Sequence, residues 1–565
     1  MVTFVYNKPI NYTTCKIMKI SKSLLGMSLA APLAACNNTA KQPNIIFFLV
    51  DDYSWADSSV AYGDRVYPEN LRFDTPNMKR LSEMGVIMTS AYACPVSTPT
   101  RTCMMTGMHA VHEHITSFTA PLPDIPTDGA GGGKLATIYD NEEDPFIRGE
   151  WNWNGISPVE GVRQTQYATP MVQLLRDAGY YTVHVGKAHW AASGTPGATP
   201  YNMGFLVQIG GTSVGHPQSY QSEDHYGNKP GMWTYAAVQN LVQYYDTGTH
   251  LTDAITKEAL RAVEYPISKG QPFYLYMSHF AVHTPIQPDS RYYQKYRDRG
   301  MDEGQARYAS MVEGVDASLG EIMKFIEDKG IADNTIIVFY ADNGGHSVDY
   351  SKGGEPHTQS LPLREGKGSC YEGGIRVPMM FYIPGKTAAG TRINTPVAAE
   401  DIFPTILEMA GITDPKTVQT TDGQSLVRLV TDGSQYVAKA VAEGKITNQM
   451  EATHFVVPES VSGLDPLRPI VSHYPHQWRV EDQPDIDFLS AIREGDWKLV
   501  YRMHDFKLEL YNLKEDIGEH NDVAAEHKDI VDKLAKDLGD KLRGWDATMP
   551  IVRATGKPVP MPDEL

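Results

Sequence analysis

The sequence predicts an α/β protein: a large, mostly parallel mixed sheet flanked by helices, then a smaller C-terminal α+β subdomain with an antiparallel sheet and a closing helix. Two continuous runs of β-branched and aromatic residues, 45–50 and 335–340, are typical of strands buried on both faces of a parallel sheet. Strand and helix patterns alternate along the chain, which places helices on the faces of the sheet. After about residue 432 this alternation ends.

Helix signals are clearest in the first part of the chain. One helix is expected from Thr75-Pro76 to near Gly85, and another from Thr169-Pro170 to Gly179. Each has threonine as the N-cap, proline at the first helical position and glycine at the end. Further expected elements are a strand over 181–185, helices over about 251–263 and 304–328, antiparallel strands over 497–502 and 508–512, and an amphipathic helix over 523–543.

The N-terminus has the features of an export signal. Lys19 and Lys22 precede an apolar stretch, 24–35, that ends in Leu-Ala-Ala-Cys at Cys36. This ending resembles a bacterial lipobox, which predicts a lipidated Cys36 and a protein held to a membrane by its lipid anchor only, in the periplasm or on the cell surface. An ordinary signal peptide cut nearby is the alternative. Met18 gives a more usual signal length than Met1. The expected division of the chain is a signal peptide over 1–36, a tether over 37–43, a catalytic domain over 44–432 and a C-terminal subdomain over 433–565.

Composition limits the classes of function. With 565 residues and 41% hydrophobic content, the chain can bury a large core and is expected to form more than one domain. The net charge of −18 argues against nucleic acid as a partner. Once Cys15 and Cys36 are set aside, three cysteines remain, and an odd number predicts no disulfide framework.

Polar side chains follow both of the predicted buried strands. Asp51-Asp52 come after the first run and Asp342-Asn343 after the second. Because ligands bind at the carboxyl ends of strands in open α/β sheets, we expect these groups to meet at one edge of the sheet. Three carboxylates and an amide oxygen form a hard donor set, suited to Ca²⁺ or Mg²⁺ rather than to zinc.

Residues 97–101, Ser-Thr-Pro-Thr-Arg, place a hydroxyl nucleophile beside an arginine at the expected start of a helix. Pro99 fits the first helical position, and the free N–H groups of a helix start would face an anion bound at Ser97. The Arg101 guanidinium offers a planar donor fork for sulfate or phosphate oxygens. The stretch therefore predicts a nucleophile built into an anion site.

These residues and several ordered motifs resemble the formylglycine-dependent sulfatases of the alkaline phosphatase superfamily, in their serine version. The nucleophile motif is a Cys or Ser with proline two residues on, arginine four on, and Thr-Gly five residues after the arginine. Ser97 matches it through Gly107, whereas Cys94 does not. The other matching stretches, in the family's order over about 44–545, are Gly186–His189, His283–Pro285, Gly366–Gly368, Tyr371–Pro378, Asp401–Leu407, Asp422–Leu426, Trp497–Val500 and Glu509–Leu513.

The resemblance implies a mechanism and a role for each matching residue. Ser97 is expected to be oxidised to formylglycine (3-oxoalanine), whose hydrate attacks sulfur and later expels sulfate. The implied metal ligands are Asp51, Asp52, Ser97, Asp342 and Asn343, with Asp342 also taking the proton of the attacking hydroxyl. Among the other residues, Arg101 and Lys187 would stabilise the alkoxide, His189 would orient the nucleophile and help to deprotonate it, His283 would protonate the leaving oxygen, and Lys367 would hold a sulfate oxygen.

The family implies partners as well. A serine nucleophile is typical of enzymes matured by a radical iron–sulfur oxidase that works without oxygen, so an anaerobic bacterial maturing enzyme is expected. Family members act mostly on aryl, lipid or carbohydrate sulfates, and a lipoprotein of anaerobic type with the loop described next favours a sulfated carbohydrate. Tryptophan rings and amides suit a sugar. The candidate substrate contacts are Trp151, Trp153 and Asn154 in the loop-like segment 121–158, His346 near the acidic cluster, and His473 and His476 in the second domain.

Two rival functions remain open at this point. A phosphate or phosphonate monoester hydrolase of the same superfamily would use the same metal and nucleophile. A catalytically silent glycan-binding lipoprotein would keep the pocket but never receive the aldehyde.

Overall fold

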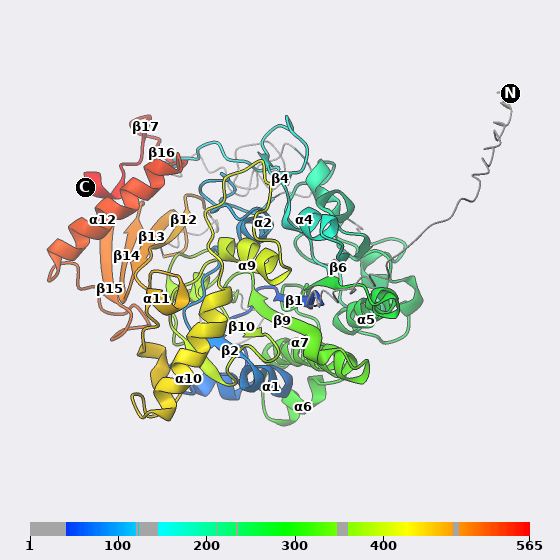
Figure 1. The fold of residues 1–565 in the computed structure, drawn as a ribbon. Helices are drawn as coiled ribbons and strands as arrows, with labels where there is room; N and C mark the ends of the chain where they lie inside the picture. Colours follow the sequence, from blue (N-terminus) through cyan, green and yellow to red (C-terminus); the bar gives the residue numbers. More distant parts are fainter. Residues whose placement is uncertain are drawn as a thin grey trace, which may run out of the picture. The chain divides into compact units, whose positions relative to one another are not determined.

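The structure is a computed structural model that describes residues 41–119, 123, 145–211, 213–232, 235–346, 360–477 and 485–565. One compact unit runs from Gln42 to Leu565 (Figure 1). The predicted signal peptide, Cys36 and most of the tether lie outside the described residues. In the part of the chain that is described, no helix is both long and apolar enough to cross a membrane.

The main sheet has eight strands in the order β11-β2-β10-β9-β1-β8-β6-β7. In chain order they are β1 (Asn44–Val50), β2 (Val86–Met88), β6 (Tyr181–Gly186), β7 (Val207–Ile209), β8 (Phe273–Ser278), β9 (Thr335–Ala341), β10 (Met379–Tyr382) and β11 (Thr391–Ile393). Within this described sheet, β10 alone runs antiparallel to its neighbours. The predicted mixed, mostly parallel sheet is confirmed.

The register of the two central strands decides where the site forms. Strands β1 and β9 pair in parallel from Asn44 opposite Thr335 to Val50 opposite Ala341. Both strands are buried along their whole length, as their apolar sequences predict. Since the two strands end level with each other, Asp51 and Asp342 emerge side by side at the carboxyl edge of the sheet.

Two groups of helices cover the sheet (Figure 1). In one group, α1, α5 and α6 pack against α7; in the other, α2, α4 and α9 pack against one another. The helices of the first group are α1 (Pro76–Met84), α5 (Leu251–Lys269), α6 (Tyr293–Asp298) and α7 (Glu303–Asp328). Those of the second are α2 (Ser97–Thr106), α4 (Met171–Asp177) and α9 (Ile402–Met409). Three further helices belong to neither group: α8 (Glu372–Ile375), α10 (Ser434–Ala442) and α11 (Glu459–Ser462).

Several predicted helix ends shift in the structure. Helix α4 begins at Met171 with Pro170, not Thr169, as its N-cap residue. Thr75 does cap α1 in position, but its hydroxyl accepts a hydrogen bond from the Ser59 N–H instead of one from the helix. Helix α5 runs six residues beyond the predicted 263, to Lys269.

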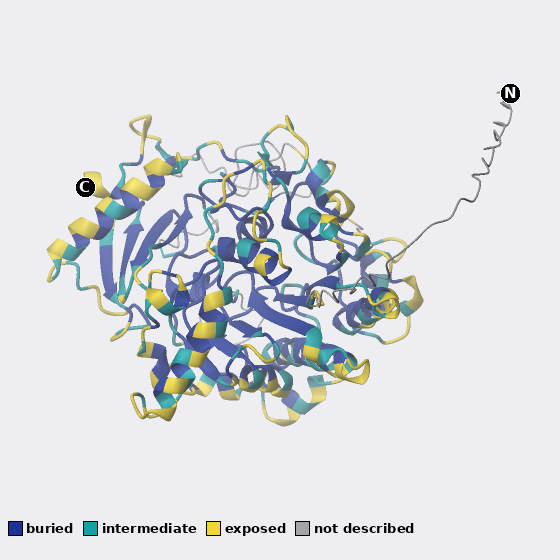
Figure 2. Ribbon diagram, viewed as in Figure 1, coloured by how far each residue is buried: buried dark blue, intermediate teal, exposed yellow. Residues whose placement is uncertain are grey.

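The C-terminal part contains a second, antiparallel sheet closed by a helix, as predicted. Its strands are β12 (Ile470–Tyr474), β13 (Leu489–Glu494), β14 (Trp497–Arg502) and β15 (Lys507–Asn512), and α12 (Lys528–Gly544) lies over them. Leu534, Leu538 and Leu542 of α12 are buried in the core that this helix shares with the sheet, while its other face is exposed (Figure 2). The helix starts at Lys528, five residues later than predicted.

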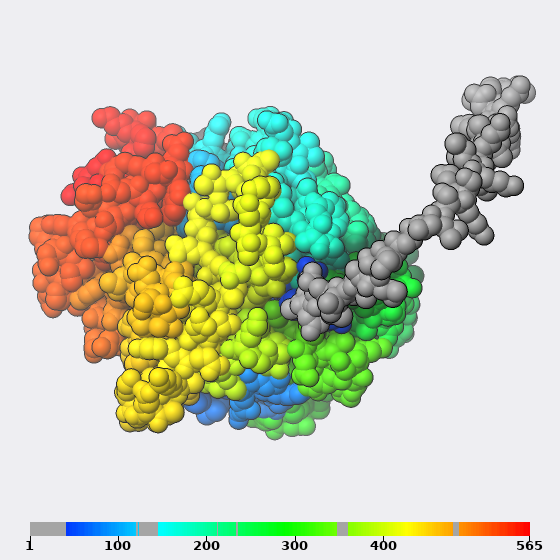
Figure 3. All heavy atoms as spheres, in the orientation of Figure 1, coloured from blue at the N-terminus to red at the C-terminus, as the bar shows by residue number. Residues whose placement is uncertain are grey.

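The remaining strands are short: β3 (Phe146–Ile147), β4 (Ile156–Ser157), β5 (Gln166–Tyr167), β16 (Ile551–Val552) and β17 (Lys557–Pro558). Helix α10 packs against β11 of the main sheet, and the second sheet starts only at Ile470. On the surface the orange and red C-terminal part continues directly from the yellow segment before it (Figure 3). The expected domain boundary near residue 432 stays a prediction.

Candidate active site

Helix α2 carries the predicted nucleophile at its first residue. Val96 is extended and α2 begins at Ser97, so Pro99 is the third helical residue rather than the first. Proline fits there for the same reason, because the N–H groups of the first turn have no partner within the helix. Every residue of α2 is buried. Gly107 ends the helix in the left-handed region at φ 72°.

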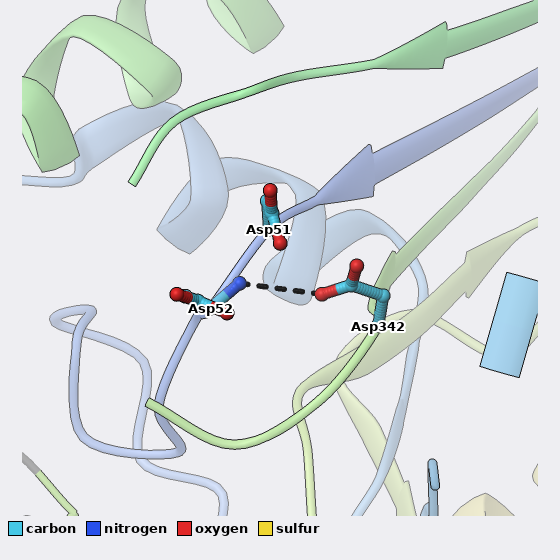
Figure 4. A group of neighbouring side chains, drawn as sticks. All are labelled: Asp51, Asp52 and Asp342. Carbon is cyan, nitrogen blue, oxygen red and sulfur yellow. Dashed lines mark hydrogen bonds between the residues drawn. The ribbon is translucent and has the colours of Figure 1, made fainter. Parts of the chain in front are cut away.

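The predicted acidic cluster is present at the carboxyl edge of the sheet. Carboxylate oxygens of Asp51, Asp52 and Asp342 lie within 4.8 Å of one another, and all three residues are buried. The Asp52 N–H donates to Asp342 Oδ1 at 3.2 Å, which joins the ends of β1 and β9 (Figure 4). Asn343 Nδ2 donates to Asp52 Oδ1 at 2.8 Å. These contacts bring all four predicted groups together.

The Ser97 hydroxyl lies at the centre of this cluster. Its Oγ donates to Asn343 Oδ1 at 2.9 Å and is 3.2 Å from Asp51 Oδ1. Lys187 Nζ, which follows β6, donates to Ser97 Oγ at 3.0 Å. The predicted nucleophile therefore contacts a carboxylate, an amide oxygen and an ammonium group.

Each carboxylate of the cluster has a cationic partner. Arg101 Nε and Nη2 lie 2.8 Å from Asp342 Oδ2. Lys187 Nζ is 2.6 Å from Asp51 Oδ2, and Lys367 Nζ is 2.6 Å from Asp52 Oδ1. Each of the three buried carboxyl groups thus lies beside one basic side chain, so the chain's own residues carry little net charge here.

Burial and these charges shift the pKa values in the site. Burial, with help from Asp342, raises the pKa of Asp51 to about 8. For Asp342 burial acts in the same direction, but Arg101 and Lys187 outweigh it and hold the pKa below its usual value. Burial lowers the pKa of Lys187, whereas Asp52 outweighs burial at Lys367 and raises that lysine's pKa.

The donor set fits a hard divalent cation. The carboxylates of Asp51, Asp52 and Asp342 lie within 4.8 Å of one another, and Asp51 and the Asn343 amide oxygen both contact the Ser97 hydroxyl. Among the described residues, no sulfur or imidazole ligand belongs to this acidic group. All-oxygen sets of this kind hold Ca²⁺ or Mg²⁺. Asp51, Asp52, Asp342 and Asn343 would hold such an ion.

A pocket of about 220 Å³ opens onto Ser97. Among the predicted residues, its wall includes Ser97, His189, His283, His346 and Lys367. Burial lowers the pKa of both His189 and His283 well below the usual histidine value. His283 Nδ1 is 3.0 Å from the Thr284 carbonyl oxygen, and its Nε2 is 3.8 Å from Asp52 Oδ2.

The pocket also has walls that the sequence analysis missed. Phe118, Thr119, Val214, Gly215, His216 and Tyr235 line it. Tyr235 Oη donates to His216 Nε2 at 2.9 Å, and the His216 ring stacks on the His283 ring with centroids 5.8 Å apart. Four of these residues belong to the long connection between β7 and α5. Its length was the available signal, because connections of that length are often functional.

Five of the predicted substrate contacts lie outside the pocket lining. Trp151 is 2% exposed and packs against Trp153 and His476. The Asn154 amide donates to the Arg163 carbonyl, and His476 Nε2 is 2.7 Å from Thr116 Oγ1. His473 contacts the Ser490 hydroxyl and the Thr548 carbonyl. In this structure these side chains connect segments of the protein instead of facing Ser97, so the predicted substrate role lacks support here.

Two histidines and the cysteines complete the comparison with the sequence. His279 is buried and contacts the Ser318 hydroxyl, so it is a core residue. His346 lines the pocket, as expected from its position three residues after Asn343 in the sequence. Cys94, Cys103 and Cys370 are free thiols.

Comparisons with known proteins agree with this geometry. The family model "Sulfatase" matches residues 43–412. A sulfatase of Formosa agariphila is 27% identical, with 94% of each chain covered, and an N-acetylgalactosamine-6-sulfatase of Rattus norvegicus is also 27% identical, covering 74% of this chain and 72% of its own. The crystal structure of Ps i-CgsB in complex with k-i-k-neocarrahexaose superposes with a TM-score of 0.62 at 25% identity, over 89% of this chain and 93% of the other.

A structure of a phosphonate monoester hydrolase from Agrobacterium radiobacter shares the fold, with a TM-score of 0.53 at 16% identity over 91% of this chain and 97% of the other. The family match covers more than half of the sequence and includes the acidic cluster, Ser97 and its cationic neighbours. This chain belongs to the sulfatase family and is a sulfuric ester hydrolase.

Proposed function

We propose that this protein hydrolyses a sulfate ester on a sugar, with a formylglycine made from Ser97 as nucleophile and a divalent cation, Ca²⁺ or Mg²⁺, beside it. The observation that carries the proposal is the position of Ser97 Oγ. It contacts Asp51, Asn343 and Lys187 at the floor of a pocket that His189, His283 and Lys367 also line.

Once Ser97 is oxidised, the hydrate of its aldehyde would supply a second hydroxyl for releasing sulfate. A bound cation would offset negative charge on the sulfate oxygens. The protein's own residues prepare the pocket for this. Lys187 donates to the nucleophilic oxygen and favours its deprotonated form. Arg101 is fixed by Asp342 and by the Ser278 hydroxyl at 2.7 Å, so its charge stays close to the nucleophile.

On the opposite wall, His283 presents Nε2 toward Asp52 and Lys367 extends over the same carboxylate. Lys367 is placed to bind a sulfate oxygen. The Thr284 carbonyl holds Nδ1 of His283, so this residue would take up a proton at Nε2, where Asp52 favours it, and hand that proton to the leaving oxygen. One oriented donor to a developing negative charge typically contributes about 3–4 kcal/mol. General acid catalysis by a histidine contributes about 10²–10⁴-fold. The charged side chains therefore matter more than the α2 terminus, worth about 0.3–1 kcal/mol.

A sugar is the favoured carrier of the sulfate group. Relatives of this chain are named for N-acetylgalactosamine-6-sulfate, and one structural relative holds k-i-k-neocarrahexaose. The pocket walls suit a sugar as well, since Phe118 and Tyr235 offer ring faces and His216 and His346 offer polar atoms.

Export and maturation form the rest of the proposal. The apolar stretch before Cys36 supports an exported lipoprotein of the periplasm or cell surface, anchored by lipid alone. A serine at position 97 supports maturation by a radical, oxygen-independent sulfatase-maturing enzyme.

Mass spectrometry of the tryptic peptide 81–101, from protein isolated in its native host, tests the nucleophile. Oxidation of Ser97 removes two hydrogens and creates an aldehyde that a hydrazide traps. Unmodified serine in all native protein would refute the formylglycine. If protein made in a foreign host carries unmodified serine, the measurement is repeated on protein co-expressed with the maturing enzyme.

Kinetics on paired sulfate and phosphate esters test the reaction. The oxidised protein should favour the sulfate ester, and Ser97→Ala should abolish turnover without changing the thermal unfolding temperature. Faster turnover of the phosphate ester would favour a phosphohydrolase. Activity that survives in Ser97→Ala would show that the nucleophile is elsewhere.

A further inference from the structure

A second cavity, of about 250 Å³, lies apart from the catalytic pocket and shares none of its lining residues. Its charged and amide lining residues are Arg65, Arg376, Arg493, Lys514 and Asn394, with the carboxylates of Asp64, Asp496 and Glu515. A smaller hollow of about 100 Å³ adjoins it, and Asn394, Arg493 and Asp496 line both. We call the two hollows together the groove, because the same charged and amide side chains line both of them.

Topology places this groove at the same sheet edge as the active site. Asn394 follows the end of β11, and Arg376 precedes β10, the antiparallel strand. Both positions therefore lie at the edge where Asp51 and Asp342 emerge. Strands β9 and β11 are three positions apart in the sheet, and at about 4.8 Å per strand this separates the two sites by roughly 14 Å along the edge.

Arg493 is the unusual residue of the groove. It lies on β13 and is 4% exposed. Its Nε donates to the Gly495 carbonyl at 2.9 Å and its Nη1 to the Tyr92 hydroxyl, while no described residue accepts from Nη2. Arg493 lines both cavities, so its side chain borders the open space of the groove.

The charges around Arg493 leave it without an ion-pair partner in the described part of the chain. Its neighbour Arg376 pairs with Glu372 at 3.1 Å, and Lys498 pairs with both Glu372 and Glu519 at 2.8 Å. No carboxylate oxygen lies within 4.0 Å of the Arg493 guanidinium among the described residues. Glu372 and Asp496 stabilise its charge from a greater distance, Glu372 through the Tyr92 hydroxyl that both side chains contact. An anionic ligand in the groove would give the guanidinium a direct partner.

Asn394 adds a second donor beside the guanidinium. Its Oδ1 accepts hydrogen bonds from the Thr89 and Ser90 hydroxyls at 3.2 and 2.6 Å, which fixes the amide and leaves Nδ2 to donate. The exposed Asp496 carboxylate is placed to accept from hydroxyl groups. A guanidinium and an amide suit an oxyanion, and a carboxylate beside them suits the hydroxyls of a sugar.

We propose that the groove around Arg493 and Asn394 is a non-catalytic binding site for an oxyanion group, sulfate or carboxylate, carried on a saccharide. The choice of a sulfated saccharide rests on the function proposed above. Its place on the same sheet edge lets one extended chain occupy the groove and the catalytic pocket together. The groove then raises the affinity for long substrates without taking part in the reaction.

Calorimetric titration of the full chain carrying Ser97→Ala tests binding without turnover. The probes are sulfated oligosaccharides, their desulfated counterparts and inorganic sulfate. Adding Arg493→Gln should weaken binding of the long sulfated probe about tenfold, the usual value of a hydrogen bond to a charged group. Arg428→Gln, at an exposed arginine, is the matched control and should leave binding unchanged.

The inorganic sulfate arm separates the two sources of the anion. If sulfate alone binds in an Arg493-dependent way, the groove recognises the free ion as well. If only the oligosaccharide does, the sugar is needed. Because Arg493→Gln also removes the contact with Tyr92, Asn394→Leu and Lys514→Gln are tested in parallel. If the folded Arg493→Gln and Asn394→Leu proteins both bind the long sulfated probe as tightly as the Ser97→Ala parent, the proposal is overturned.

Kinetics give an independent readout. With Ser97 intact, Arg493→Gln should raise KM for a long sulfated substrate about tenfold and leave kcat on a small sulfate ester unchanged. Absence of sulfate ester turnover in the unaltered protein would refute the proposed function but leave the titration interpretable. Normal turnover with unchanged KM in the variant would refute only the groove.

Discussion

Replacing Lys367 with methionine tests whether the active site is held together by charge balance. Methionine keeps most of the side-chain volume and removes the charge. Lys367 Nζ is 2.6 Å from Asp52 Oδ1, and the lysine side chain is 5% exposed. At an effective dielectric constant of about 20, this separation corresponds to about 6 kcal/mol of Coulomb attraction, part of which offsets the cost of burying the lysine.

The expected net loss is about 3 kcal/mol in the free energy of unfolding of the metal-free protein. Breaking a buried pair usually costs about 3–5 kcal/mol. Asp52 keeps other partners, among them the Asn343 amide at 2.8 Å, which places the loss at the lower end. The other two carboxyl groups, Asp342 and Asp51, keep their partners Arg101 and Lys187.

The same variant should bind calcium more tightly than the unaltered protein. Lys367 competes for Asp52, so its removal leaves a net charge of about −1 that a divalent cation can neutralise. A gain of about 1.4 kcal/mol would be tenfold in Kd. Sulfate ester turnover should still fall, because the contact proposed for a sulfate oxygen is lost.

Urea unfolding in chelator and calcium titration by calorimetry measure the two effects. Lys439→Met, at an exposed lysine on α10, is the control and should change neither quantity. A Lys367→Met protein as stable as the unaltered one in chelator would refute the charge-balance reasoning. So would weaker calcium binding.

Two further predictions concern other parts of the structure. A Cβ added at Gly215 would lie 2.5 Å from His189 Cε1. Gly215→Ala should therefore displace the His189 ring and lower kcat by up to about 100-fold. Gly544→Ala is the control and should leave kcat unchanged, because a Cβ there would meet open space. Burial lowers the pKa of His473 to about 3. Unfolded chains therefore take up its proton below pH 6.5 while the folded protein does not, and stability falls by about 1.4 kcal/mol per pH unit as the pH drops from 6.5 toward 3. His473→Gln should flatten that slope in urea unfolding at pH 6, 5 and 4; an unchanged slope, or equal flattening by His520→Gln at an exposed position, would contradict this.

Much of the fold could be predicted because burial on both faces is visible in the sequence. The strands β1 and β9 are unbroken apolar runs, and their parallel pairing follows from the alternation of strands and helices. Strands such as β2 and β11 have three residues each and belong to no such run. They exist because neighbouring strands offer hydrogen bonds, which is a tertiary effect that local sequence does not encode.

The catalytic half of the site could be predicted for a related reason. Asp51 and Asp342 follow strands, and strand ends meet at one edge whatever the loops do. The specificity half could not. Trp151 and Asn154 have the composition of a sugar site, yet their side chains pack within the protein, while His216 and Tyr235 reach the pocket from a connection without regular pattern. Composition identifies what a loop can bind but not where the loop goes.

Charge also explains how an acidic protein can recruit an anionic substrate. The chain carries a net charge of −18, and its active-site carboxylates and cations cancel one another. Screening over about 8–10 Å reduces the repulsion from distant charges, but the pocket itself offers a sulfate ester little net attraction. A divalent cation held by Asp51, Asp52, Asp342 and Asn343 would change the local charge to about +2. Affinity for sulfated ligands should therefore depend on the cation even in the Ser97→Ala protein, where no reaction can occur.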